Sequence, residues 1–356
     1  MEAVLVAGGV GSRLRPLTVQ HPKHVLPVAG VPFLAHQIAK LAVAGVDRVV
    51  LAVSYRASEF EQTFGSGREF GVELIYIIEQ EPLGTAGAIR NVASLLRGRP
   101  ADPVVVLNGD ILSGHDLAAQ VALHHDRLAD VTLHLVEVED PLPFGCVPTD
   151  PTGRVTAFLE KSPAPVSSQV NAGCYILNRS VIDEIPIGRA VSIERESFPE
   201  LLAKGRRVMA YTEDAYWLDL GTPASLVQAS CDLVRGIAKS PAYDQPPAES
   251  RVLPGAMVAP SASISRGSTI GSGAEIEAEA AVLGSVVMDS ATIGKGASVV
   301  DSVVGPAARV GAGTRVRDAV IGDGANIGEA CELANGVRVW CGATLGDGAV
   351  RFSTDA

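Results

Sequence analysis

The residues best suited to chemistry lie in one short segment near the start of the chain. An apolar run, Val4 to Ala7, predicts a buried strand that leads into this segment. Three glycines follow it: Gly8, Gly9 and Gly11. After them come the hydroxyl of Ser12 and two cationic side chains, Arg13 and Lys23. Glycines let the backbone come close to a ligand and expose its N–H groups. N–H donors, a guanidinium fork and an ammonium together suit the oxygens of a polyphosphate.

Two well-known phosphate loops do not fit this segment. The Rossmann fingerprint requires a third glycine where Leu14 stands, and an acidic residue on the next strand. The P-loop requires a Gly-Lys-Ser or Gly-Lys-Thr ending, which this segment lacks. For the segment taken alone, a tight turn that binds no ligand stays open as an alternative.

The order that remains is a strand, Gly-Gly-x-Gly-Ser-Arg and then Pro22-Lys23. This order resembles the sugar-1-phosphate nucleotidyltransferases. The resemblance implies that the strand end and the loop bind a nucleotide through Val6, Ala7, Gly8, Gly9, Gly11, Ser12, Arg13 and Lys23. It also implies catalytic roles for Arg13 and Lys23, which would stabilise the departing pyrophosphate.

Length, charge and cysteine usage narrow the class of protein. A chain of 356 residues predicts two domains. The net charge of −11 argues against a nucleic-acid partner, and we expect no membrane partner because no apolar run reaches membrane length. The five cysteines form no C-x-x-C pair, which is typical of reduced thiols in a cytoplasmic protein.

Up to about residue 235, strand-like and helix-like segments alternate. The expected strands are 48–53, 73–78, 103–108 and 130–138, and the expected helices are 33–45, 84–96 and 116–129. Such alternation predicts an α/β, Rossmann-like mixed but mainly parallel sheet with helices on its faces. Ligands of such sheets bind beyond the carboxyl ends of the strands, where the glycine loop and Asn108 are expected.

The sequence beyond residue 250 has a different pattern. From Val252 to Leu345, apolar residues recur in steps of six, with three steps of five, and glycine often follows them. This hexapeptide repeat predicts a C-terminal left-handed β-helix, in which equivalent apolar residues stack from coil to coil. We therefore expect a catalytic domain at 1–238, a Pro-rich linker at 239–250 and the β-helix at 251–356.

The segment 79–89 resembles the nucleobase loop of the family. Guanine presents two adjacent donors, N1–H and the 2-amino group, and the Glu79 carboxylate can accept both. Relatives that use uracil or thymine resemble this segment with Gln instead. The resemblance adds further nucleotide-binding residues: Pro82, Gly84, Thr85 and Asn108.

Two aspartates stand in strings that resemble the family's metal ligands. Asp110 lies in LNGDI and Asp219 in YWLDLGTP. The resemblance implies that both carboxylates hold Mg²⁺ and border the sugar phosphate. Carboxylates completed by phosphate oxygens and water are the ligands that Mg²⁺ prefers.

Three further strings, at 144–147, 158–162 and 170–177, resemble the family's sugar-phosphate pocket. They supply Gly145, Glu160, Lys161, Asn171 and Gly173. By the resemblance, Glu160 accepts hydrogen bonds from sugar hydroxyls, and Lys161 has a catalytic role in placing the attacking 1-phosphate.

Across residues 5–225 the likeness is greatest to the subgroup that joins GTP and mannose 1-phosphate into GDP-mannose and pyrophosphate. Alternatives that stay open are a uridylyl- or thymidylyltransferase acting on glucose 1-phosphate and a non-catalytic regulatory paralogue. An acetyltransferase is disfavoured, because the β-helix contains no histidine to act as a base. We expect a homo-oligomer, a dimer or a dimer-based assembly, because solenoid ends and faces favour self-association.

Overall fold

A computed structural model describes the whole chain except residues 54–55, 80, 160–163 and 354–356. By its internal contacts the chain forms two compact units. The first contains Met1–Gly9 and Gln37–Trp217, and the second contains Val10–His36 and Leu218–Ala356. The boundary expected at 239–250 stays a prediction.

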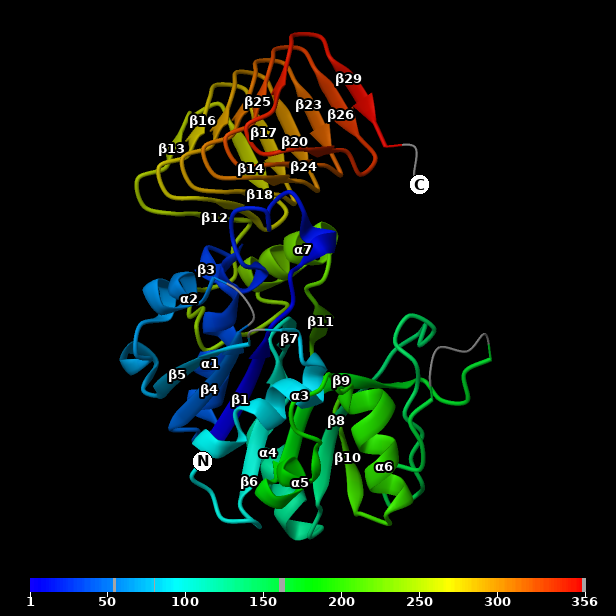
Figure 1. Cartoon of the computed structure of the whole chain (residues 1–356). Helices are drawn as coiled ribbons and strands as arrows, with labels where there is room; N and C mark the ends of the chain where they lie inside the picture. The colour runs from blue at the N-terminus through cyan, green and yellow to red at the C-terminus, as the bar shows by residue number, and fades with distance from the viewer. Residues whose placement is uncertain (54–55, 80, 160–163, 354–356) are drawn as a thin grey trace. The chain divides into compact units, whose positions relative to one another are not determined.

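The first unit is built on a seven-stranded sheet flanked by helices (Figure 1). Its strands, in spatial order, are β10 (Val208–Thr212), β8 (Val131–Glu137), β9 (Gln169–Asn178), β6 (Pro103–Asn108), β1 (Glu2–Ala7), β4 (Arg48–Val53) and β5 (Glu73–Ile78). Strand β9 is antiparallel to both of its neighbours, and the other pairs are parallel. The predicted mixed, mainly parallel sheet is confirmed.

The centre of this sheet is apolar on both faces. Val4 of β1 pairs with Val50 of β4 on one side and with Val106 of β6 on the other, and all three side chains are fully buried. Burial on both faces explains why these strands are continuous apolar runs in the sequence. Their carboxyl ends lead to the glycine loop and to Asn108, at the edge where ligands of parallel sheets bind.

The α-helices are short. They are α1 (Phe33–Val43), α2 (Ala57–Phe64), α3 (Gly84–Asn91), α4 (Leu117–Asp126), α5 (Arg179–Glu184), α6 (Phe198–Ala203) and α7 (Pro223–Val234). The 3₁₀ turns are η1 (Ser12–Leu14), η2 (Lys23–Val25), η3 (Arg68–Phe70) and η4 (Ala93–Leu95), and η5 (Ile193–Ser197) is a π-helix. Among the described residues, no helix is long and apolar enough to span a membrane.

The expected helices 33–45, 84–96 and 116–129 differ from the structure in their bounds. The segment 84–96 divides into α3 and η4, because the backbone at Val92 departs from α-helical values (φ −92°, ψ −2°) and tightens the turn. Val92 and Ala93 are thereby buried in the core of the first unit. The helix expected at 116–129 begins one residue later, because the Asp116 side chain caps it by accepting a hydrogen bond from the Ala119 N–H at 2.9 Å.

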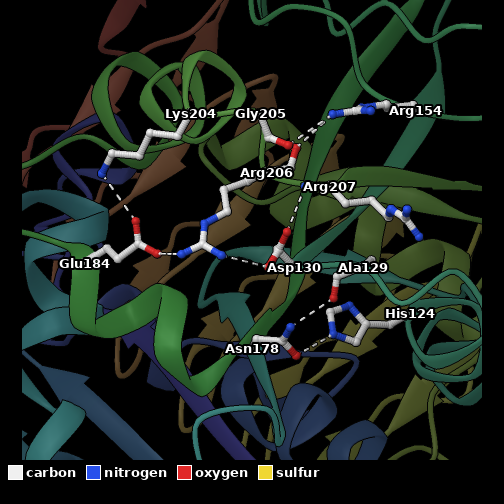
Figure 2. A network of polar contacts seen from close by, with 10 residues as sticks. All are labelled: His124, Ala129, Asp130, Arg154, Asn178, Glu184, Lys204, Gly205, Arg206 and Arg207. Carbon is white, nitrogen blue, oxygen red and sulfur yellow. Dashed lines mark hydrogen bonds and ion pairs between the residues drawn. The ribbon is translucent and has the colours of Figure 1, made fainter.

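Charged side chains that pair with one another lie at the amino ends of β8 and β10 (Figure 2). The Arg206 guanidinium contacts Glu184, and it donates to Asp130 at 3.3 Å. Asp130 also accepts a hydrogen bond from the Arg207 N–H at 2.8 Å. Lys204 lies 3.3 Å from Glu184 on the other side. These contacts join the amino ends of β8 and β10 to α5 and α6, so this end has a structural role.

The second unit contains three parallel six-stranded sheets (Figure 1). The first is β12 (Ser250–Val252), β15 (Ser268–Ile270), β18 (Val286–Val287), β21 (Val303–Val304), β24 (Val320–Ile321) and β27 (Arg338–Val339). The second is β13 (Met257–Val258), β16 (Glu275–Ile276), β19 (Thr292–Ile293), β22 (Arg309–Val310), β25 (Asn326–Ile327) and β28 (Thr344–Leu345). The third is β14 (Ser263–Ser265), β17 (Ala281–Leu283), β20 (Ser298–Val300), β23 (Arg315–Arg317), β26 (Glu332–Ala334) and β29 (Val350–Phe352).

Apolar residues of successive coils stack on one another as the repeat predicts. Val282 pairs with Val299, which pairs with Val316, and all three are buried in a continuous apolar core. The predicted β-helix after an α/β domain is confirmed. The first coil is less covered, since Val252 is 42% and Val258 is 37% exposed. The remaining short strands are β2 (Pro27–Val28), β3 (Val31–Pro32), β7 (Ile111–Ser113) and β11 (Trp217–Asp219).

Candidate active site

The glycine-rich loop has a backbone that a side chain would disturb. Gly11 has φ +63°, and a Cβ there would lie 3.0 Å from Thr18 Cγ2 and 3.1 Å from Lys23 Cβ. The Gly11 carbonyl accepts a hydrogen bond from Thr18 Oγ1 at 2.7 Å. Glycine is therefore required at this turn by its backbone angle and by the close approach of Lys23. The side chains of Ser12 and Arg13, in η1, are exposed and available to a ligand.

Arg13 and Asp219 come together beside Gly221 in the second unit. A Cβ on Gly221 would lie 2.8 Å from Arg13 Cζ and 2.9 Å from Asp219 Oδ1. Gly221 therefore makes room for the guanidinium and the carboxylate, which the sequence placed in separate motifs. The sequence analysis missed this role of Gly221. The glycine lies in the string that resembles the metal segment, which is the signal that could have found it.

The β-helix holds the same loop. Leu14 and Leu17 are buried in a cluster with Val286, Val303 and Val320. Three polar contacts lie at the edge of this cluster. They are Arg338 Nη1 to the Arg15 carbonyl at 2.8 Å, Cys341 Sγ to the Pro16 carbonyl at 3.5 Å, and His21 Nε2 to Asp323 Oδ2 at 2.9 Å. The loop that carries Arg13 and Lys23 is thus packed on the repeat domain.

In the first unit, Glu79 lies just beyond β5 and is 94% buried, with an exposed fraction of 6%. Its N–H donates to the Val53 carbonyl at 2.8 Å. Burial raises the pKa of the carboxyl, and a hydrogen bond from the Leu83 N–H partly opposes this shift. Among the described residues, Glu79 Oε1 has no hydrogen-bond partner. A buried acceptor atom in this state suits a ligand with hydrogen-bond donors.

The rest of the predicted nucleobase segment is held against Val191. Gly84 has φ +67°, and a Cβ there would lie 2.7 Å from the Val191 carbonyl oxygen. The Val191 N–H donates to the Leu83 carbonyl at 2.8 Å, and the Ala86 N–H donates to the Val191 carbonyl at 3.0 Å. Pro82 and Thr85 lie at the start of this turn, next to the beginning of α3.

Two side chains of α1 donate hydrogen bonds to the backbone of the loop that contains Asp110. Gln37 Nε2 donates to the Asn108 carbonyl at 3.0 Å and to the Ile111 carbonyl at 2.6 Å. Lys40, one turn further on, donates to the Ser113 carbonyl at 2.8 Å. The Gly109 N–H donates to the Val6 carbonyl at 2.8 Å, which ties this loop to the end of β1. Gln37 and Lys40 were missed because their partners are backbone carbonyls that no motif marks.

Lys40, which binds this loop, also belongs to a cluster with two buried histidines, His115 and His134. Lys40 Nζ is 2.9 Å from His115 Nδ1, and the rings of His115 and His134 stack with centroids 3.8 Å apart. Burial lowers the pKa of Lys40 to about 8, lowers that of His134 to about 3 and lowers that of His115 strongly. The two histidines are therefore neutral at pH 7 and act as packed rings.

Two of the predicted sugar-phosphate residues border a cavity of about 490 Å³ in the first unit. Gly145 and Asn171 line it, together with Phe158, Leu159 and Glu194. Gly173 lies behind Asn171, and its N–H donates to Asn171 Oδ1 at 3.1 Å. Glu160 and Lys161 lie outside the described residues, so their roles stay predictions. Glu194 was missed by the sequence analysis.

Comparison with known proteins identifies the family. The family model described as Nucleotidyl transferase matches residues 2–236, more than half of the chain. The chain belongs to this family. A second model, described as the GMPPB C-terminal domain, matches residues 248–341. The resemblance drawn from the motifs is confirmed.

Individual relatives give the same result. The chain is 52% identical to a mannose-1-phosphate guanylyltransferase of Mycobacterium tuberculosis, over 100% of this chain and 98% of the relative. It is 35% identical over 269 residues to a mannose-1-phosphate guanyltransferase of Yarrowia lipolytica, covering 74% and 73% of the two chains.

Solved structures resemble the chain over about two thirds of its length. A putative glucose-1-phosphate thymidylyltransferase from Bacillus anthracis superposes with TM-score 0.59 and 27% identity, covering 65% of this chain and 94% of the other. The HddC protein of Yersinia pseudotuberculosis, solved in complex with GMP-PN, superposes with TM-score 0.55 and 28% identity, covering 64% and 97%.

Proposed function

We propose that this chain is a mannose-1-phosphate guanylyltransferase, which makes GDP-mannose and pyrophosphate from GTP and mannose 1-phosphate. The observation that carries the proposal is the 52% identity to the M. tuberculosis enzyme across both whole chains. The buried Glu79, whose Oε1 has no hydrogen-bond partner among the described residues, supports guanine as the base. A uracil or thymine ring offers only one donor, which lies between two carbonyls, so one of the two Glu79 carboxylate oxygens would receive no hydrogen bond from the base.

The reaction is an in-line displacement at the α-phosphorus of GTP. An oxygen of the mannose 1-phosphate forms the new P–O bond, and the bond to the departing pyrophosphate breaks on the opposite side. The nucleophile is already an anion, so the chain need not supply a general base. What it must supply is positioning of two anions and stabilisation of the growing negative charge.

The residues divide this work as follows. Arg13 and Lys23 stabilise the leaving pyrophosphate, with the backbone N–H groups of the glycine loop, and the β-helix keeps this loop in place. Lys161 places the attacking phosphate, and Asn171 and Gly145 border the hexose. Gln37 fixes the loop on which Asp110 is carried.

We also propose that the chain uses Mg²⁺. Asp110 and Asp219 would provide hard carboxylate oxygens, and phosphate oxygens and water would complete the set, which fits this ion. When bound, Mg²⁺ neutralises charge on the phosphates. Arg13, whose guanidinium lies next to Asp219 beside Gly221, adds a positive charge that the protein itself supplies.

We propose a cytoplasmic location from the state of the cysteines. All five cysteines, each among the described residues, are free thiols, which fits a reducing cytoplasm. A homo-oligomer stays a prediction.

Pyrophosphate release tests the proposal. The assay combines GTP, ATP, UTP, CTP and dTTP with the 1-phosphates of mannose, glucose and N-acetylglucosamine in the presence of Mg²⁺. We expect a dominant signal with GTP and mannose 1-phosphate, and its loss by orders of magnitude in Asp110→Ala and Lys161→Ala with the fold intact. A dominant signal with UTP or dTTP and glucose 1-phosphate would refute the base assignment. Silence of the folded wild type would favour a regulatory paralogue.

A further inference from the structure

A carboxylate that the sequence analysis did not assign to the sugar-phosphate pocket lines a cavity bordered by two of the predicted sugar-binding residues. Glu194 borders this cavity of about 490 Å³ together with Gly145 and Asn171. It is separated from Asn171 by 22 intervening residues, since the two are 23 apart in the sequence. The fold therefore adds to the cavity a charged acceptor from outside the three strings, at 144–147, 158–162 and 170–177, that predicted this pocket.

Two donors, the partly buried Asn171 and the fully buried Tyr175, fix the orientation of this carboxylate. Asn171 Nδ2 donates to Glu194 Oε1 at 3.2 Å, and the Tyr175 hydroxyl donates to the same oxygen at 3.3 Å. Asn171 Nδ2 also lies 2.8 Å from the Tyr175 hydroxyl oxygen, so the three groups form a closed triangle. Tyr175 is fully buried, and burial raises its pKa well above the ordinary value, so its hydroxyl keeps its proton and remains a donor.

The backbone beneath Glu194 has an unusual form. Residues Ile193–Ser197 make a π-helical turn, which Ser192 caps by accepting a hydrogen bond from the Arg195 N–H at 3.2 Å. Such single π-turns occur often at functional sites, because they alter the direction of one side chain within a helix. On the far side of the turn, the ring of Phe198 packs against Tyr175 with centroids 5.2 Å apart. The residue that ends the π-turn, Phe198, therefore packs against Tyr175, which is one of the two residues that orient the Glu194 carboxylate.

Only one oxygen of Glu194 is used by these contacts. Both donors bond to Oε1, and no described residue donates a hydrogen bond to Oε2. A carboxylate oxygen held in this way at a cavity wall can accept a hydrogen bond from a neutral hydroxyl, and such a charge-assisted bond is stronger than one to a neutral acceptor. A hexose presents hydroxyls on every face, whereas the phosphate of the same substrate would be repelled. The carboxylate therefore suits the sugar ring.

We propose that Glu194 is a specificity-determining residue, which accepts a hydrogen bond from a hydroxyl of the hexose in the sugar 1-phosphate. This inference rests on the proposed function, because it assigns a partner to the sugar of that reaction. Tyr175 and Asn171 are then positioning residues for Glu194. Loss of the carboxylate weakens binding of the sugar phosphate and leaves binding of GTP unchanged.

Steady-state kinetics of Glu194→Gln test this inference. The change keeps the side-chain shape and the acceptor for Asn171 but removes the charge. We expect the KM for mannose 1-phosphate to rise by about 10- to 100-fold, as for loss of a hydrogen bond to a charged group, with the KM for GTP within about twofold. Glu200→Gln, which changes an exposed carboxylate six residues further on, is the matched control and leaves both values unchanged.

A set of deoxy sugars shows whether the contact is direct. The 2-, 3-, 4- and 6-deoxy forms of mannose 1-phosphate each remove one hydroxyl. We expect one of them to bind the wild type much more weakly and to suffer little further loss in Glu194→Gln, because the hydroxyl and the carboxylate belong to one interaction. Equal losses for wild type and variant with all four analogues, or an unchanged KM for the sugar phosphate, would overturn the inference.

A second variant and a second choice of substrate keep the test of Glu194 decisive. If Glu194→Gln fails to fold, Tyr175→Phe provides the second variant, and we expect it to raise the same KM by a smaller factor because Oε1 loses one of its two donors. Wild-type silence with mannose 1-phosphate would count against the proposed function. The variants would then be compared with whichever hexose 1-phosphate the wild type accepts, so the role of Glu194 is decided separately.

Discussion

His21 Nε2 lies 2.9 Å from Asp323 Oδ2, and this contact joins the N-terminal loop to the β-helix. Asp323 is 8% exposed, so it offers its charge from a nearly buried position. Together with the contacts of Arg338 and Cys341 to the backbone of the loop, it makes the repeat domain a support for the segment that carries Arg13 and Lys23. The β-helix thereby gains a role in positioning, in addition to any role in assembly.

Removal of this contact should impair turnover more than stability. We expect Asp323→Ala to lower kcat/KM by about two- to tenfold, because the loop keeps its apolar cluster and two other contacts. The thermal midpoint should change by only a few degrees, since His21 is partly exposed. Glu332→Ala, at an exposed carboxylate of β26, is the control. Equal kinetics for the two variants would refute the role of the contact.

Gln37 should affect the requirement for Mg²⁺. Gln37→Leu removes both hydrogen bonds that hold the carbonyls on either side of Asp110. We expect the Mg²⁺ concentration at half-maximal rate to rise by about 10- to 100-fold, as happens when the partners of metal ligands are removed. The same change at Gln62, an exposed residue of α2, should have no effect. The measurement is the rate of pyrophosphate release against Mg²⁺ concentration, and an unchanged curve would contradict the prediction.

Glu79 should control the choice of base. We expect Glu79→Gln to lower kcat/KM for GTP by about 10- to 100-fold, because guanine loses a charged acceptor for two donors. Glu69→Gln, at an exposed carboxylate of η3 outside the nucleobase segment, should leave the value unchanged. A preference for GTP that survives in Glu79→Gln would show that backbone groups recognise the base instead.

The same residue predicts a pH dependence. Burial raises the pKa of Glu79, so its carboxylate takes up a proton at a higher pH than an exposed carboxylate does. Because only the ionised form accepts both guanine donors, kcat/KM for GTP should fall as the pH drops through this raised pKa. The pH profile of Glu79→Gln should lack this step.

His36 should make the protein sensitive to acid. Its ring is 2.7 Å from Ser240 Oγ and 3.2 Å from the Val28 carbonyl, and burial lowers its pKa to about 4. The unfolded chain binds this proton at a pKa of about 6.5, so the stabilising contribution is complete above pH 6.5 and is lost as the pH falls towards 4. The shift corresponds to about 3 kcal/mol of unfolding free energy.

Urea unfolding at pH 7.5 and pH 5 measures this effect. We expect the loss of stability between the two values to be smaller in His36→Gln than in the wild type by about 2 kcal/mol. His125→Gln, at an exposed ring of α4, should behave like the wild type. Identical pH dependence in His36→Gln and the wild type would contradict the assignment.

Local patterns in the sequence were sufficient for the architecture. The hexapeptide repeat predicted the β-helix, because each coil has to bury its apolar residue against the next one. The apolar runs at 48–53 and 103–108 predicted strands of a mainly parallel sheet, and they are apolar throughout because both of their faces are covered. The glycine-rich segment predicted a turn with close backbone contacts, and Gly11 has the positive φ and the near neighbours that require glycine.

Tertiary structure decided which residues support the chemistry. Asp323 contacts a residue 302 positions away, and Gln37 contacts carbonyls more than 70 positions away. Glu194 belongs to the sugar cavity because a π-turn and the buried Tyr175 bring it to Asn171. Such contacts leave no periodicity in the sequence, since each depends on how distant segments pack. The sequence by itself determined the two folds and the family motifs, because repeats, apolar runs and glycine turns are local. Only the folded chain decided the partners of those motifs, because burial and hydrogen-bond geometry arise from packing across the whole molecule.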